Sequence, residues 1–503
     1  MSAYSILLII GIYFSVLLLI SLVAGRGGTD NEAFFLGNRR SPWWVVAIGM
    51  VGSSLSGVSF VSVPGMVRDI GFTYMQTVAG FFFGYLVIAG VLLPLYYRRG
   101  FTSIYTYLEE RFGQRSYKTG AACFLVGKTI GAAARLYVVA LMLQTLVFDS
   151  LGVPFVANVC GIIVLIWLYT FRSGIKAIVW TDTLQTVVML AALVLLMVEA
   201  ARRIGLGAGE LASTLVHSDM TRLFVLDDWH SKQNFFKQFF SGIFIAIVMT
   251  GLDQDMMQKN LTCRSLPEAQ KNMRWYGASF MPVNFLFLTL GAMLLVLAGQ
   301  EGIALPAQSD EILPLFASQY LGKTALVLFV VGIVAAAFSS ADSALAALTT
   351  SLAVDILGIG RQQPRQAKRT RIAVHVGISA AFVGIILLFR AVNNTSVIDV
   401  IYTLVSYTYG PLLGLFAFGL FTKRPTCDRA VPFIAVAAPV LCGLLDWASH
   451  HWWGYAFGYE LLMLNGLLTF AGLWAAKGIE NGKWKVENDS FAACIATRYV
   501  YPA

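Results

Sequence analysis

The sequence has few charged residues for its length. Of its 503 residues only 13% are Asp, Glu, Lys or Arg, where a soluble protein has about 25%. A soluble chain of this length would form several domains whose surfaces need that charge, so a soluble globular protein is excluded, as are a disordered chain and a coiled coil. Hydrophobic residues make up 57% and the mean hydropathy is +0.71. The composition therefore predicts a polytopic membrane protein, with the lipid bilayer as its surroundings.

Cysteine and known catalytic motifs are also scarce. The six cysteines form no CxxC or other metal-spaced pair, so we expect free thiols rather than disulfides or a metal site. The sequence has no HExxH, GxSxG or Walker motif, and nothing in it indicates an enzyme. The net charge is +9, and we expect the excess Lys and Arg residues mainly in cytoplasmic loops. The charge is therefore not interpreted as a sign of nucleic-acid binding.

Apolar segments follow one another along nearly the whole chain. A span needs about 20 apolar residues, and about thirteen segments are candidates. The predicted spans are 4–24, 42–66, 74–95, 119–148, 158–169, 177–198, 235–256, 278–297, 324–356, 372–389, 397–421, 430–447 and 459–475. They predict an all-α transmembrane domain over residues 1–476. Residues 477–503 are expected to form a cytoplasmic tail.

Lys and Arg concentrate in alternate connections between these spans. One such group comprises Lys259, Arg264, Lys271 and Arg274, which we interpret as loop residues. Because positive charge favours the cytoplasmic side, the pattern predicts the N-terminus outside and the C-terminus in the cytoplasm.

Two predicted spans contain helix-breaking residues at matching positions. The second reads VVAIGMVGSSLSGVSFVSVPG and the seventh reads FFSGIFIAIVMTGLDQD. Five spans separate their starts, so each could begin one of two five-helix units of opposite orientation. Paired interrupted helices indicate the binding site of a secondary transporter. The alternative is that Gly and Ser merely allow close helix packing.

Three charged residues, Asp182, Asp342 and Arg135, lie within predicted spans. Charges at membrane depth are costly and by default indicate function. Arg135 either binds an anionic group of a substrate, which guanidinium matches in a bidentate way, or neutralises Asp182 or Asp342.

The ninth predicted span carries a polar face. Ser339, Asp342 and Ser343 lie three or four residues apart and therefore share that face, with Ser340 on its flank. Hydroxyl and carboxylate oxygens suit a hard cation such as Na⁺ rather than a transition metal. Alternatively, Asp342 forms a structural ion pair with Lys128 or Arg135.

Several segments along the chain match one family in order. They are YYRRGFTSIYTYLEERFG, SGIKAIVWTDTLQ, GLDQDMMQKNLTCRSLPEAQKNM, AFSSADSAL and YGPLLGLFAFGLFTKR. In these segments the chain resembles the sodium:solute symporter family, which includes sodium/glucose, sodium/proline, sodium/iodide and sodium/sialic acid transporters. The resemblance implies a LeuT-type 5+5 inverted repeat over 42–200 and 235–421. It adds one extra helix at 4–24 and two at 430–475.

The resemblance also implies Na⁺ as the coupling ion, held between the first and eighth core helices. Carried over by position, its ligands would be backbone oxygens of Gly52, Leu55 and Ala336 and the hydroxyls of Ser339 and Ser340. Some members, including the sialic acid transporter, have a second sodium site, for which the matching residues are Asp182, Ser339, Asp342 and Ser343.

The chain departs from the sialic acid transporter at Asp342, where that protein has a hydroxyl residue. Two carboxylates, Asp182 and Asp342, are thus expected close together. Either the second cation is held more tightly, or one carboxylate is protonated, or Arg135 or Lys128 compensates.

The substrate pocket implied by the resemblance lies near the middle of the membrane. Its expected lining residues are Ser54, Ser56, Ser59, Phe60, Gln76 and Arg135. Arg135 matches the carboxylate-binding arginine of the sialic acid transporter. The pocket glutamine of that protein aligns with Val78, however, and the sugar-binding glutamine of the galactose transporters aligns with Ser59. These matches favour an organic anion or a sugar-like solute such as a sugar acid.

Together these observations predict a secondary active transporter that couples a small organic solute to Na⁺ by alternating access. We expect it in the plasma membrane, the inner membrane of a bacterium. The alternative is a proton-coupled symporter of the same fold that uses Asp182 or Asp342 as proton carrier. Nothing in the sequence indicates an oligomeric state.

Overall fold

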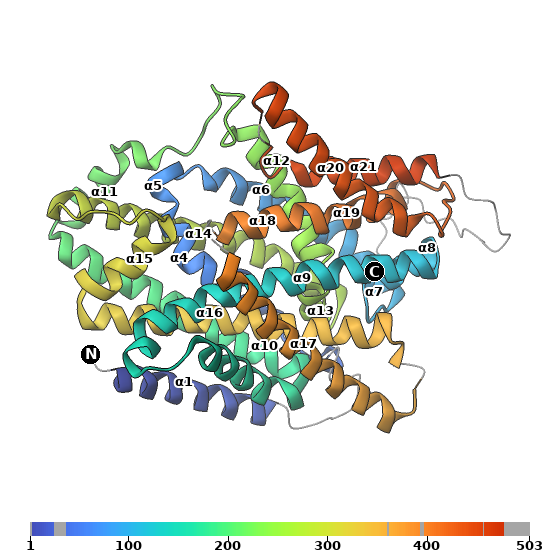
Figure 1. Cartoon of the computed structure of the whole chain (residues 1–503), viewed down its shortest axis with the longest axis horizontal. Coiled ribbons are helices and arrows are strands. Elements are labelled where there is room, and N and C mark those ends of the chain that lie inside the picture. Colours follow the sequence, from blue (N-terminus) through green and yellow to red (C-terminus); the bar gives the residue numbers. More distant parts are fainter. Residues whose placement is uncertain (1–2, 25–36, 360–361, 393–396, 456, 477–503) are drawn as a thin grey trace, which may run out of the picture.

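The computed structural model describes residues 3–24, 37–359, 362–392, 397–455 and 457–476 (Figure 1). The predicted tail, 477–503, lies outside the described residues. Within the described ranges the regular structure is helical, and the single β-bridge joins Ser41 to Cys263. An all-α chain is what the long apolar runs predict, because a helix satisfies its own backbone hydrogen bonds in lipid.

The α-helices are labelled as in Figure 1. They are α1 (Ala3–Ala24), α3 (Trp43–Ser54), α4 (Gly57–Gly65), α5 (Val67–Ile70), α6 (Tyr74–Val87), α7 (Leu93–Arg99), α8 (Thr106–Arg111), α9 (Gln114–Leu143), α10 (Phe155–Ile204), α11 (Ala208–Val216), α12 (Phe235–Ala246), α13 (Gln254–Asn260), α14 (Leu266–Glu301), α15 (Ile312–Leu315), α16 (Gly322–Ser351), α17 (Pro364–Val392), α18 (Val397–Thr408), α19 (Gly410–Phe421), α20 (Val431–Trp453) and α21 (Leu461–Ala475).

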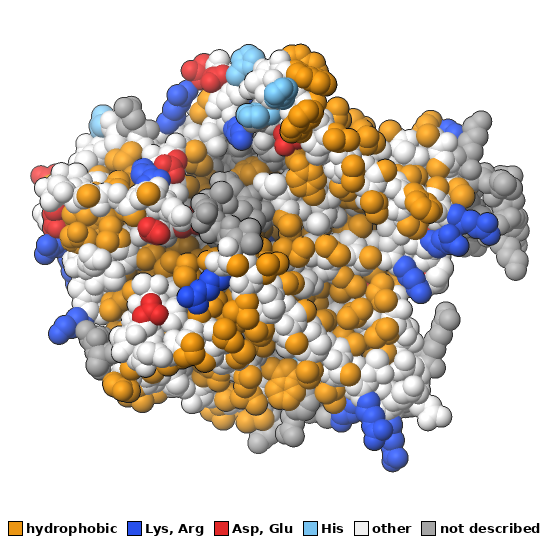
Figure 2. All heavy atoms as spheres, in the orientation of Figure 1, with side chains coloured by type: hydrophobic (Ala, Val, Ile, Leu, Met, Phe, Trp, Pro, Cys, Tyr) orange, Lys and Arg blue, Asp and Glu red, His pale blue; other side chains and the backbone are white. Residues whose placement is uncertain are grey.

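Many of these helices could cross a membrane. The described residues contain eight helices that are long and apolar enough, three bent helix pairs, and two shorter apolar helices, Phe155–Leu168 and Leu461–Ala475. Both predicted spans 158–169 and 177–198 fall within α10, whose backbone is helical throughout, so no loop separates them. Figure 2 shows hydrophobic side chains over the middle of one face, with many Lys and Arg side chains towards its margins.

The two helices predicted to be interrupted are both broken. α3 and α4 meet at an angle of 61° around Leu55 and Ser56, and Ser56 has an extended backbone (φ −76°, ψ 173°). Gly57 follows the break, where an added Cβ would collide with the side chain of Val139 on α9. The glycine therefore lets the broken helix approach α9 closely, and irregular backbone at this depth is tolerated because it is buried.

The second break separates α12 from α13. A π-helical turn, Ile247–Gly251, ends α12, and the following α13 is inclined by 69°. The side chain of Asp253 accepts hydrogen bonds from the backbone N–H groups of Asp255 and Met256, so it caps the new helix. A third bend, of 43° between α18 and α19, is absent from the sequence predictions.

α16 lies at the centre of the bundle. The helix belongs to the span Gly322–Ile356, and 72% of the most apolar stretch of that span is buried inside the protein. The corresponding share for the span of α1 is 28%. α16 packs against α3, α4, α9, α10 and α17. Its many Ala and Ser residues allow this close approach of neighbouring helices. The polar face of α16 is thereby held against the first break.

Candidate substrate and cation sites

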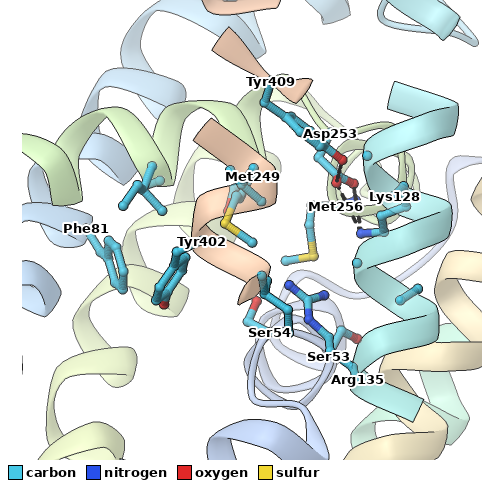
Figure 3. Close-up of a pocket in the computed structure, with 18 of the residues that line it drawn as sticks. Ser53, Ser54, Phe81, Lys128, Arg135, Met249, Asp253, Met256, Tyr402 and Tyr409 are labelled. Carbon is cyan, nitrogen blue, oxygen red and sulfur yellow. Dashed lines mark hydrogen bonds and ion pairs between the residues drawn. The ribbon is translucent and has the colours of Figure 1, made fainter. Parts of the chain in front are cut away.

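A cavity lies between the two broken helices. Side chains from α3, α6, α9, α12, α13, α14 and α18 surround about 710 Å³ of space, including its open mouth. Ser53 and Ser54, the last residues of α3, line it, so the cavity reaches the first break. Much of the remaining lining is apolar or aromatic, with Phe81, Met249 and Met256 among its members (Figure 3).

The hydroxyl groups around the cavity are largely bonded to one another. Ser54 Oγ and the Tyr276 hydroxyl are 2.6 Å apart, and the Tyr276 and Tyr85 hydroxyls are 3.1 Å apart. The Tyr402 hydroxyl is 3.0 Å from that of Tyr74, and Tyr409 donates to Asp253 Oδ2 at 3.0 Å. These groups are therefore held in place by the protein itself.

Arg135 extends from α9 into the cavity, beside Ser54 (Figure 3). Within the part of the chain that the structure describes, no side chain forms an ion pair or hydrogen bond with it. A guanidinium group that lines a mostly apolar cavity, with its hydrogen-bond donors not taken up by these side chains, is suited to bind an anion from outside.

Lys128, two turns earlier on α9, is fully engaged. Its Nζ lies 3.1 Å from Asp253 Oδ2 and 2.8 Å from Asp255 Oδ2, and all three side chains are less than a tenth exposed. These contacts tie α13 to α9 just beyond the second break. The ammonium of Lys128 therefore pairs with Asp253 and Asp255 rather than with Asp342.

Lys259 forms a second buried ion pair. Its Nζ lies 2.8 Å from Asp182 Oδ2 and 3.7 Å from Asp255 Oδ1, and it donates a hydrogen bond to Ser53 Oγ. The exposed fractions of the Lys259 and Asp182 side chains are 1% and 0%. The interpretation of Lys259 as a loop cation is therefore wrong: the bend after Gly251 turns α13 inward and carries this side chain into the core.

The polar face of α16 meets Asp182 on α10. Ser339 Oγ donates to Asp182 Oδ1 at 2.7 Å and Ser343 Oγ donates to Oδ2 at 3.2 Å. Ser343 Oγ also lies 3.1 Å from Asp342 Oδ1. The four residues predicted for the second cation site are thus brought together.

The five residues predicted for the first sodium site lie around the first break. Ser53 Oγ on α3 is 3.3 Å from Ser339 Oγ, so the end of α3 contacts α16 here. Gly52 precedes Ser53, and Leu55 lies in the break itself. On α16, Ala336 and Ser340 are buried, and Ser340 Oγ donates to Ala337 O at 3.0 Å.

The residues predicted to line the substrate pocket divide into two groups. Ser54 and Arg135 line the cavity, and Ser56, Ser59, Phe60 and Gln76 do not. Phe60 packs against Phe287 and Phe329, with ring centroids 5.5 and 6.1 Å away. Gln76 bonds to backbone atoms of Thr73, Val225 and Gln233 and so fastens a loop.

Four residues of the site are missing from the predictions as functional residues: Asp253, Asp255, Lys259 and Tyr409. The signal was present in GLDQDMMQKN, where three charges follow a helix-breaking glycine at the end of an apolar run. A sharp bend there keeps the charges inside, whereas a straight helix would deliver them to the loop.

Broken helices, a central cavity and buried polar clusters at the breaks define a helical membrane transporter. A match to the sodium:solute symporter family covers residues 34–432. The chain therefore belongs to this family of transporters, which confirms the resemblance.

Two relatives cover most of the chain. A sodium/sialic acid symporter of Proteus mirabilis is 24% identical over 438 residues, which are 84% of this chain and 86% of the relative. A sodium-dependent multivitamin transporter of Oryctolagus cuniculus is 29% identical over 434 residues, 82% of this chain and 66% of the relative.

A solved structure shares the fold. It is the substrate-bound, outward-open state of a Na⁺-coupled sialic acid symporter, with a TM-score of 0.80 and 21% identity over 94% of this chain and 96% of that one. The likeness confirms a polytopic all-α transporter fold. The count of thirteen spans remains a prediction.

Proposed function

We propose that this protein is a secondary active symporter that carries a small organic anion together with Na⁺. The observation that supports it most is Arg135, which reaches into a cavity beside the broken helix and forms no ion pair or side-chain hydrogen bond among the described residues. A carboxylate is the anionic group that a guanidinium matches in a bidentate way.

The rest of the cavity favours a carboxylate with an apolar body over a neutral sugar. A sugar needs several free donors and acceptors, but the hydroxyls of Tyr276, Tyr85 and Tyr409 are already bonded within the protein. No Asn, Gln or Glu side chain belongs to the described lining. Burial of apolar solute surface against side chains such as Phe81 and Met256 would stabilise the bound solute.

The sodium site is proposed to consist of backbone oxygens of Gly52, Leu55 and Ala336 with the hydroxyls of Ser339 and Ser340. The break after α3 frees backbone carbonyls from helical bonding. Ser339 and Ser340 donate their protons to Asp182 and Ala337, which leaves oxygen lone pairs for a hard cation.

The positions of these sites support a mechanism of alternating access. Na⁺ would join α3 to α16, and the contact between Ser54 and Tyr276 would pass its effect to the substrate cavity. Coupling requires only that Na⁺ binds one conformation better than the other. We propose two inverted repeats, with predicted spans 158–169 and 177–198 joined in the continuous helix α10. The N-terminus would lie outside and the C-terminus in the cytoplasm of a bacterial cell.

Proton coupling through Asp182 is less favoured by these contacts. Its carboxylate has an ammonium partner at 2.8 Å and two serine donors from α16, all of which stabilise the charged form. A proton carrier must instead exchange its proton easily in each cycle.

The test begins with thermal-shift screening of the purified protein against monocarboxylates, sialic acid, neutral sugars, amino acids and vitamins, with and without Na⁺. We expect a carboxylate to stabilise the protein more when Na⁺ is present. Arg135→Gln should weaken its binding about 10- to 150-fold, because a hydrogen bond to a charged group contributes about 1.5–3 kcal/mol. Arg135→Lys should lose less. Stabilisation by a neutral sugar that is indifferent to Arg135→Gln would contradict the proposal.

A further inference from the structure

Lys259 lies where a second cation is expected. The residues matching the second sodium site of some family members are gathered around Asp182, and the ammonium group of Lys259 contacts that carboxylate directly. We propose that Lys259 is a tethered cation that takes the place of the second Na⁺, so that the protein binds one Na⁺ per transport cycle. This inference rests on the proposed sodium coupling.

The first argument is that the oxygens of Asp182 already have partners. Oδ1 accepts from Ser339 at 2.7 Å, and Oδ2 accepts from Ser53 at 3.0 Å, from Ser343 at 3.2 Å and from Lys259 at 2.8 Å. A sodium ion bound to this carboxylate would have to displace at least one of them.

The second argument is charge. A sodium ion on Asp182 would lie about 4 Å from the ammonium group, and repulsion between two unit charges at that distance would weaken its binding roughly 1,000-fold at an effective dielectric constant of 20. Asp342, the extra carboxylate of this chain, also interacts electrostatically with Lys259. The ammonium therefore neutralises one of these two neighbouring carboxylates, which a sodium ion would otherwise have to do.

The third argument is that Lys259 is held in position. Its side chain is 1% exposed and sits on α13, whose Asp255 lies 3.7 Å from the ammonium. Asp255 is fixed in turn by Lys128 at 2.8 Å. The ammonium therefore cannot leave Asp182 without a buried charge losing its partner, which is strongly unfavourable.

Charge movement is a measurable consequence. One Na⁺ transported with one monovalent anion moves no net charge, whereas two Na⁺ with the same anion move one positive charge. Lys259 belongs to the protein and is not released in either compartment.

Binding of ²²Na⁺ to the purified full-length protein tests the proposal without a known substrate. We expect saturation at one Na⁺ per chain for the wild type and for the charge-preserving variant Lys259→Arg. Lys259→Met should bind two, because the orphaned Asp182 then needs a cation. Adding Asp182→Asn to Lys259→Met should return the count to one.

Two Na⁺ per wild-type chain, or a single one in folded Lys259→Met, would overturn the proposal. If Lys259→Met cannot be purified as a folded protein, the wild-type count decides. A wild type that binds no Na⁺ would refute the proposed sodium coupling instead. In that case, the gain of one ion on Lys259→Met would still support Lys259 as the occupant of the second site but would overturn the count of one Na⁺ per cycle.

Discussion

Lys128 offers a measure of how strongly the second broken helix is held to α9. Its ammonium lies 3.1 and 2.8 Å from the carboxylates of Asp253 and Asp255, and the side-chain exposures are 9%, 4% and 4%. Lys128→Met keeps the length and removes the charge. Because breaking a buried pair leaves an uncompensated charge, we expect a loss of about 3–5 kcal/mol in the free energy of unfolding. SDS titration of the protein in mixed micelles measures it.

An exposed ion pair provides the matched control. Arg222 and Asp227 are 2.7 Å apart, but 55% and 75% of their side chains are exposed, so Arg222→Met should cost about 0–1 kcal/mol. Lys128→Met combined with Asp255→Asn should recover part of the loss, since one orphaned carboxylate is removed. Equal stabilities of Lys128→Met and Arg222→Met would refute the reasoning.

Three further changes have definite expected outcomes. Gly52→Ala should destabilise the fold by about 1–3 kcal/mol in the same SDS titration, because the added Cβ would collide with a threonine side chain of α10. Gly377 has open space around it, so Gly377→Ala should be neutral or slightly stabilising. Ser339→Ala with Ser340→Ala should abolish Na⁺-dependent uptake in proteoliposomes while leaving the elution profile of the purified protein unchanged; retained uptake would exclude these hydroxyls as sodium ligands. Arg135→Gln should raise the KM for the anion about 10- to 150-fold in the same liposomes, with a smaller rise for Arg135→Lys.

Much of the fold is predictable from the sequence because membranes impose simple rules. Long apolar runs must be helices, and paired Gly- and Ser-rich interruptions mark the two broken helices, which the structure bends by 61° and 69°. The polar face of α16 was predictable too, since Ser339, Asp342 and Ser343 follow helical spacing.

The ion-pair partners could not be predicted in the same way. Spacing indicated that Asp182 is buried, but its partner depends on the direction of α13 after the bend, which no local pattern specifies. For this reason the sequence alone favours a position in a loop for Lys259. Gln76 illustrates the same limit, because it bonds to the loop that contains Val225 rather than lining the cavity.

The most direct test of the central claim is uptake by proteoliposomes of the carboxylate that stabilises the protein best. An inward Na⁺ gradient at equal pH should drive accumulation above equilibrium, and an inward proton gradient without Na⁺ should not. Accumulation driven by the proton gradient alone, with no response to Na⁺, would contradict sodium-coupled symport.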